Sequence, residues 1–170
     1  MKYLFLILLI TLTIGCKKSN SKENAIIQNT DKKEVVKHEA ILKLSILSKE
    51  KITPWKEYKN VKENIIKFEN ISASEALNNA LHIAKVIKQL KDSIRPKALL
   101  TPSFRTRVNV LENEALRLKD MTFISAITNS EVNKQVEKIL QAFSATNSKI
   151  NTVYAQLSVE TEIKIQQSIK

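Results

Sequence analysis

The sequence predicts an all-α protein: an antiparallel helical bundle of about four to five helices with heptad-like seams. Apolar residues recur at alternating spacings of four and three over long stretches between residues 72 and 157, as they do along helices packed at shallow angles. Patterns typical of helix starts precede these stretches. The chain has a single glycine, Gly15, and only 5% aromatic residues. A protein built from tight β-hairpins, which favour glycine at positive φ, is therefore not expected.

Residues 1–15 have the pattern of a secretory signal peptide. A short start containing Lys2 is followed by an apolar run from Leu4 to Ile14 and then by the small residue Gly15. The alternative is an uncleaved membrane anchor. The uncharged stretch from Tyr3 to Cys16 is 14 residues long, which is shorter than the ~20 residues that a membrane-spanning helix needs. We therefore expect a cleaved signal peptide.

The Gly15-Cys16 pair after this apolar run resembles the lipobox of bacterial lipoproteins. That family usually has leucine three positions before the cysteine, where this chain has Thr13, with Leu12 one position further back. The resemblance implies that Cys16 becomes the first mature residue and carries acyl chains, which hold the protein on a membrane. In this family the residue after the cysteine affects sorting. Lys17 at that position implies the outer membrane. The acidic tag that some envelope lipoproteins carry after the cysteine is missing here, which implies a body on the periplasmic face.

The rest of the chain is expected to divide into a flexible tether, residues 16–31, and a single helical bundle domain, residues 32–170. The tether is polar and lacks a sustained apolar period, and a flexible segment of this length has a typical reach of ~20 Å. The bundle region resembles small helical envelope lipoproteins of bacteria with Lys-, Asn- and Ile-rich proteomes. This resemblance has no diagnostic motif, so it implies a class of protein and no active site.

Two helices are expected in the first part of the bundle region. The first covers residues 33–48, where apolar side chains recur at helical spacing. The second opens at Thr53-Pro54, because a capping hydroxyl before proline is typical of a first helical turn. The apolar positions are Val36, Ala40, Leu44 and Leu47 in the first helix, and Tyr58, Val61, Ile65 and Phe68 in the second.

Three longer helices follow, each with its own start signal. The segments 72–75 and 128–131 are capping boxes, and Thr101-Pro102 repeats the capped-proline pattern. Pro96 ends the first of the three, and the alternating tail Val159–Ile165 is expected to continue the last helix or to fray. The expected seams are Ala76, Ala80, Ile83, Ile87, Leu90 and Ile94; Phe104, Val108, Leu111, Ala115 and Leu118; and Val132, Val136, Ile139, Phe143, Thr146, Ile150, Val153 and Leu157.

Catalytic and cofactor sites are not expected. One cysteine allows neither a disulfide within the chain nor a CxxC site, and two histidines cannot form HExxH. His82 falls on the polar face of its helix, and His38 with Glu34 one turn earlier suggests an exposed helix pair. Met121 is the only methionine after the signal peptide, so haem ligation is not expected either. We therefore expect no enzyme activity, no cofactor and no metal.

A concentration of basic residues is the strongest candidate for a binding site. Seven Lys and Arg residues and one acid, Asp92, lie between residues 85 and 107. Cations near a helix C-terminus complement the helix dipole, which accounts for Lys91 and Arg95 but not for Arg105 and Arg107 at the next helix start. The alternative is an ordinary solvated face. The candidate anion-binding residues are Lys85, Lys88, Lys91, Arg95, Lys97, Arg105 and Arg107.

The partner is expected to belong to the cell envelope. Export argues against nucleic acid for a chain of net charge +11, so anionic lipid head groups or envelope polymers are the expected counter-charge. The apolar connection Met121–Ile127 is expected to cap the core, with a partner surface as the alternative. The favoured function is a lipid-anchored periplasmic interaction or scaffold protein. The alternatives are a binder of anionic envelope lipid or polymer and, ranked last, an enzyme without a recognisable motif.

Overall fold

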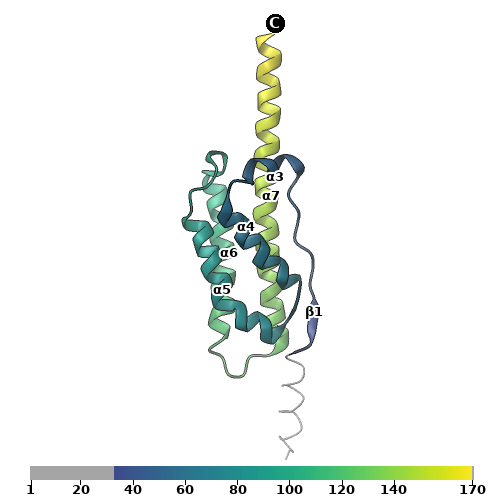
Figure 1. Cartoon of the computed structure of the whole chain (residues 1–170), viewed down its shortest axis with the longest axis vertical. Coiled ribbons are helices and arrows are strands. Elements are labelled where there is room, and N and C mark those ends of the chain that lie inside the picture. Colours follow the sequence, from purple (N-terminus) through teal and green to yellow (C-terminus); the bar gives the residue numbers. More distant parts are fainter. Residues whose placement is uncertain (1–32, 170) are drawn as a thin grey trace, which may run out of the picture. The chain divides into compact units, whose positions relative to one another are not determined.

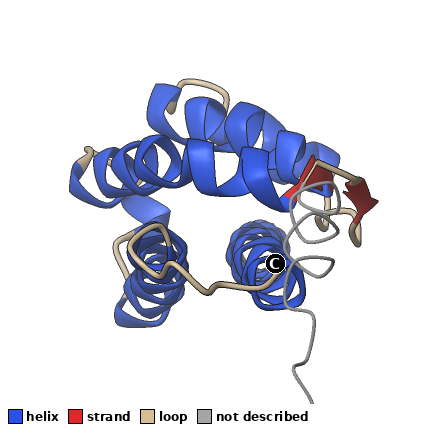
Figure 2. Cartoon of the chain, turned by 90° about the horizontal axis from the view of Figure 1, so that it is seen from below, coloured by secondary structure: helices blue, strands red, loops and turns tan. Residues whose placement is uncertain are grey.

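The computed structural model describes residues 33–169, which form a mostly α-helical fold (Figure 1). A two-stranded antiparallel sheet lies at one edge of the helices (Figure 2). The all-α prediction is therefore confirmed. The predicted signal peptide, Cys16 and the tether lie outside the described residues. In chain order the elements are β1 (Val35–Lys37), α3 (Ile46–Ile52), α4 (Lys56–Ile65), the 3-10 turn η1 (Ile66–Glu69), β2 (Asn70–Ser72), α5 (Ala73–Asp92), the 3-10 turn η2 (Lys97–Leu99), α6 (Pro102–Met121) and α7 (Asn129–Ser168).

The three long helices begin where their capping patterns predict. The hydroxyls of Ser72 and Thr128 accept hydrogen bonds from the amides three residues later, and the glutamates at those positions accept from the cap amides in return. These reciprocal bonds satisfy backbone donors that the first helical turn leaves open. Thr101 caps α6 through the amide of Phe104, with proline at the first helical position.

α6 runs antiparallel to both α5 and α7 (Figure 1). Nζ of Lys91 on α5 lies 2.6 Å from a carboxylate oxygen of Glu112 on α6. Nε2 of Gln135 on α7 donates to the backbone carbonyl and the carboxylate of Glu114, each at 2.8 Å. Glu114 lies seven residues before the end of α6 and Gln135 six residues after the start of α7, as in a helical hairpin. Lys91 lies one residue before the end of α5, whereas Glu112 lies ten residues after the start of α6, so the start of α6 extends past the end of α5.

The seams predicted for these helices form the core, with two exceptions. Ile94 lies beyond the end of α5 and is 97% exposed, because the chain is already extended at Ser93 before Pro96. Leu157 is 40% exposed, because α7 has passed the other helices at that point. The remaining seam residues are all buried, and they pack with the four apolar positions predicted for the second helix.

The predicted first helix, residues 33–48, is wrong. β1 pairs with β2 in the register Val35–Ser72, Val36–Ile71 and Lys37–Asn70. The chain is then extended over residues 38–45, which we call the strap, and α3 starts only after the cap Ser45. The positions predicted for the seam of this helix do not form a buried face: Ala40 is exposed, and the other three are only partly buried.

Side chains from distant parts of the sequence hold the strap in its extended form. The amide of Ile41 donates to the carboxylate of Glu69 at 2.9 Å, and the amide of Leu42 donates to Oγ of Ser144 at 3.0 Å. Asn147 donates to the carbonyl of Leu42, and Asn151 bonds the amide of Ser45 and the carbonyl of Lys43. These bonds satisfy backbone groups that a helix would have satisfied internally.

The second helix starts later than its sequence pattern predicts. Thr53 forms the C-terminal cap of α3, and its hydroxyl donates to the carbonyl of Lys49. Pro54 lies in the following turn, and α4 begins at Lys56 after a Trp55 cap that makes no side-chain capping bond. Trp55 is instead held by the core, where its Nε1 donates to Oγ of Ser93 at 2.8 Å. Tertiary packing therefore fixes this boundary.

The bundle has two distinct ends. β1, the α6–α7 connection and the start of α7 lie at one end, which we call the entry end because the described chain begins there (Figure 1). The end of α5, η2 and the start of α6 lie at the opposite end, the far end. At the far end α7 continues past the other helices, which confirms the helical continuation predicted for Val159–Ile165. None of the described helices is both long and apolar enough to cross a membrane.

Candidate functional site

Two of the seven candidate anion-binding residues are neutralised by acids. Nζ of Lys88 lies 2.7 Å from a carboxylate oxygen of Asp92 one turn later, and Lys91 pairs with Glu112. The hydrogen bond from Lys88 lowers the pKa of the Asp92 carboxyl, so this acid stays ionised. Only part of the positive charge that the sequence places here is thus available to an external anion.

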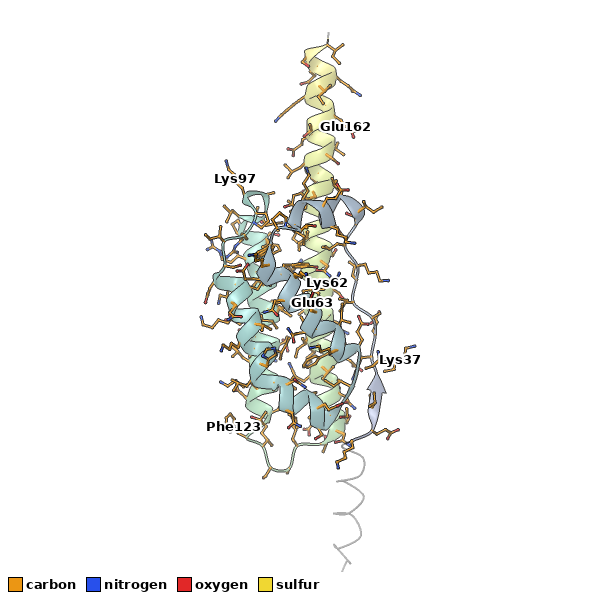
Figure 3. The ribbon with its side chains drawn as sticks, in the orientation of Figure 1. Lys37, Lys62, Glu63, Lys97, Phe123 and Glu162 are labelled. Atoms are coloured by element: carbon orange, nitrogen blue, oxygen red, sulfur yellow. The ribbon has the colours of Figure 1, made fainter. Side chains whose placement is uncertain are left out.

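Arg95 and Lys97 have different roles at the far end. A guanidinium nitrogen of Arg95 donates to the backbone carbonyl of Lys91 at 2.8 Å and so satisfies an open carbonyl of the last turn of α5. Lys97 is exposed at the tip of the far end (Figure 3) and forms no ion pair among residues 33–169. The helix-dipole interpretation therefore suits Arg95, while Lys97 remains a candidate for an external partner.

Arg105 and Arg107 lie on different sides of α6. Positions two apart on a helix project about 200° apart, and positions seven apart share a face. Arg105 is seven residues before Glu112, which faces α5, and Arg107 is seven before Glu114, which faces α7. Neither arginine forms an ion pair within the described part of the chain. Arg105 therefore lies on the side of α6 that faces α5, and Arg107 lies on the side that faces α7.

Lys85 and Lys88 line a shallow groove between α4 and α5. Its volume is about 670 Å³, and the basic side chains on its walls include Lys56 of α4, which the sequence pattern did not single out. Glu57 and Asp92 line the same groove. Three lysines and two acids line this groove, so it is a polar crevice of mixed charge.

His38 is the clearest residue that the sequence interpretation misplaced. It was expected in an exposed helix pair with Glu34, but it is 7% exposed, and its amide donates to the carbonyl of Glu69 beside the sheet. Nδ1 lies 3.6 Å from a carboxylate oxygen of Glu137 on α7, and neither ring nitrogen has a hydrogen-bond partner among the described residues. Only the long-range pairing of β1 with β2 buries this side chain, so no local pattern could have indicated it.

His82 and Tyr58 also have hydrogen-bond partners within the described chain. His82 is exposed, as predicted, and lies 3.2 Å from the side-chain oxygen of Asn64. Burial raises the pKa of Tyr58, whose hydroxyl donates to Oδ1 of Asn147 at 2.7 Å. Between residues 33 and 169, no three His, Cys, Asp or Glu side chains gather closely enough to hold a metal ion.

Exposed aliphatic side chains gather on the part of α7 beyond the bundle. From Ala155 onward nearly every residue is exposed, and 14 helical residues extend about 20 Å. Val159 and Ile163 lie one turn apart, as do Ile165 and Ile169, so they form two aliphatic stripes, and Glu162 and Gln166 lie between the stripes around the helix. Glu160 and Lys164 lie on the other side. We call this segment, residues 155–169, the α7 projection.

No protein-family model, curated protein or solved structure matches this chain. The candidate surfaces are therefore defined by geometry and charge alone. They are the α7 projection and the cations at the far end, of which Lys97 and Arg105 are exposed and free of acidic partners within residues 33–169.

Proposed function

We propose that this protein is a lipid-anchored interaction protein of the bacterial envelope, held on the periplasmic face of the outer membrane by acyl chains on Cys16. One observation carries the interaction role: the α7 projection leaves the bundle with aliphatic side chains exposed. A helix in water is stabilised mainly by packing one face against a neighbour. The projection lacks such a neighbour within the described chain, and a helical or grooved partner protein would supply it.

The position of the projection fits this role. The described chain begins at the entry end, and the projection leaves from the far end. α6 has 20 residues and is therefore about 30 Å long. A bundle tethered at its entry end would thus present the projection well away from the anchoring membrane, where it could reach a periplasmic partner.

The interaction is tested by site-specific photo-crosslinking in cells that produce the full chain. A photoreactive residue at Ile163 should capture a discrete protein, whereas the same residue at Lys164, on the polar side of the helix, serves as the matched control. Ile163→Asp should abolish capture from a probe at Val159 without lowering the melting temperature, because the side chain is exposed. Equal capture at positions 163 and 164 would contradict a specific docking face.

The lipid anchor is tested separately. Cys16→Ser should leave the precursor uncleaved at this position and without acyl chains, because the predicted lipobox depends on the cysteine. Mass spectrometry of the protein from membranes would measure both effects. An unmodified Cys16 in the mature wild-type chain would remove the anchor from the proposal while leaving the α7 projection as an interaction surface.

A second function, binding of an anionic envelope polymer, is favoured by the far-end cations. Arg105, Lys97 and the α5 lysines share this end, and their excess charge is only partly neutralised by Asp92 and Glu112. Because this end lies opposite the point where the chain enters the bundle, a polymer beyond the membrane fits better than lipid of the anchoring membrane. Salt-sensitive co-sedimentation with such a polymer would test it.

A further inference from the structure

The connection between α6 and α7 presents apolar side chains at the entry end. The ends of this connection cap the core as expected, since Met121 packs against it and Ile127 is buried. Its middle does not: Phe123 is 80% exposed and Ile124 is 51% exposed. Figure 3 shows Phe123 at the opposite end of the bundle from Lys97. We call Phe123 and Ile124 the loop tip.

The loop tip lies in an uncharged segment whose backbone is largely satisfied internally. No charged residue occurs from Met121 to Ser130, although charged residues make up 26% of the chain. The amides of residues 122, 123, 124 and 127 donate to carbonyls three residues earlier, and the hydroxyl of Thr122 donates to the carbonyl of Lys119. Transfer of this loop out of water would therefore leave few backbone donors unsatisfied.

The loop tip lies at the same end of the bundle as the start of the described chain. β1 begins at Val35, and α7 starts directly after the loop. Only residues 17–32 separate Cys16 from the described chain, and the tether predicted from the sequence would have a typical reach of ~20 Å. A membrane that holds Cys16 is thus within reach of this end.

We propose that the loop tip is a membrane-contact surface, in which Phe123 and Ile124 insert into the interfacial region of the bilayer that holds Cys16. The proposal rests on the lipid anchor of the proposed function. Aromatic and aliphatic side chains partition favourably at this depth. A tether of this length confines the loop near the membrane, so two side chains suffice where they would not hold a free protein.

The contact is apolar in character. The charged residues nearest to the loop in sequence are Lys119, Asp120, Glu131 and Lys134, two of each sign. Binding through the loop tip should therefore depend little on salt or on anionic lipid, unlike binding through the far-end cations. It would also fix the orientation of the molecule, with the α7 projection directed away from the membrane.

The test attaches the protein to vesicles without enzymatic lipidation. Cys16 is the only cysteine in the chain, so a protein that starts at residue 16 can be coupled through this thiol to a maleimide-lipid. The vesicles contain phosphatidylethanolamine, phosphatidylglycerol and brominated phosphatidylcholine. Phe123→Trp should show blue-shifted emission that the brominated lipid quenches. Lys97→Trp, at the far end, is the matched control, and the buried Trp55 contributes equally to both. Ile124→Ser in the Phe123→Trp chain should reduce the quenching.

Each outcome bears on one claim. Quenching at position 123 that persists at high salt and is absent at position 97 supports the proposal. Equal quenching at the two positions, or none, overturns it. A photoreactive residue at position 123 that captures protein instead of lipid in cells would also overturn it, in favour of a protein partner at this end. Because coupling is chemical, failure of natural lipidation would leave the vesicle result unaffected and would appear only in the mass of Cys16.

Discussion

The hydroxyl of Tyr58 on α4 donates a 2.7 Å hydrogen bond to Oδ1 of Asn147 on α7, and Nδ2 of the same amide donates to the carbonyl of Leu42 in the strap. One buried side chain thus joins three segments that are far apart in the sequence. The Tyr58 ring also stacks on Phe143, with ring centroids 5.7 Å apart. The polar groups in this junction are hydrogen-bonded to one another. Removal of one group therefore leaves its partner buried without a hydrogen bond.

Tyr58→Phe should lower the free energy of unfolding by about 1–3 kcal/mol at neutral pH, because Oδ1 of Asn147 loses its donor. The variant should also change the response to alkali. Burial raises the pKa of Tyr58 above its ordinary value of about 10, so the unfolded chain loses this proton first as the pH rises. The wild type should lose stability above pH ~10, and part of that loss should vanish in Tyr58→Phe.

Chemical denaturation as a function of pH measures both effects. Tyr154→Phe is the matched control, because burial raises the pKa of Tyr154 as well, while its hydroxyl has no bond to Asn147. An alkaline profile identical in wild type and Tyr58→Phe would show that the Tyr58 hydroxyl is not buried.

His38 should tolerate an apolar replacement better than its burial suggests. Its ring nitrogens have no hydrogen-bond partner in the described residues, and the nearest acid, Glu137, lies 3.6 Å away with half of its side chain exposed. Replacing a buried, unsatisfied polar group by an apolar one of similar size can be nearly neutral or stabilising. The free energy of unfolding of His38→Leu should therefore lie within ~1 kcal/mol of wild type or above it.

His38→Ala is the control in the same assay, because it removes the side-chain volume as well and should be clearly destabilising. If His38→Leu were as unstable as His38→Ala, the imidazole would be making a polar interaction, and ionisation next to Glu137 would be the first to examine.

The long helices could be predicted because their determinants are local. A capping box spans four residues, and a seam repeats within one helix, so Ser72 and Thr128 are informative without knowledge of the fold. The strap could not be predicted in this way. Its backbone is satisfied by Ser144, Asn147 and Asn151, all more than 100 residues later in the chain. A weak helical period in residues 33–48 is overridden by these tertiary bonds and by pairing with β2.

The candidate surfaces, too, could be predicted only in those features that depend on local sequence. The seven cations are visible in the sequence, but the pairing of Lys91 with Glu112 depends on the antiparallel arrangement of α5 and α6. The direction in which Phe123 points depends on the turn between α6 and α7, whose amides bond three residues back. Sequence reasoning could identify the apolar connection but not which of its residues cap the core.

Seam residues and surface residues should differ sharply in their effect on stability. Ile87 on α5 and Ile139 on α7 are fully buried in the core, as their positions in the seams predict. Replacing either by alanine should cost ~2–5 kcal/mol, from lost burial and a residual cavity. The exposed Lys134 is the control, and Lys134→Ala should change the free energy of unfolding by no more than ~0.5 kcal/mol. Equally mild effects in chemical denaturation would contradict the heptad packing.

The two arginines at the start of α6 should differ in their effect on anion binding. A shared patch would make reversal of either one equally damaging, but Arg105 lies on the α5 side of α6 whereas Arg107 lies on the α7 side. Arg105→Glu should therefore weaken co-sedimentation with an anionic envelope polymer, by ~1 kcal/mol for each unit of charge near the anion. Arg107→Glu makes the same change in net charge and is the matched control.

Both variants should fold, because the side chains are exposed and cations are unfavourable near a helix N-terminus. Binding by wild type and by Arg107→Glu should fade as salt rises, since exposed charges are screened over ~8–10 Å at physiological ionic strength. Equal losses in the two variants would mean that net charge alone attracts the polymer, because position on α6 would then have no effect. Wild-type binding that is absent, or that does not respond to salt, would return Lys97 and Arg105 to an ordinary solvated surface and leave the α7 projection as the sole candidate for the far end.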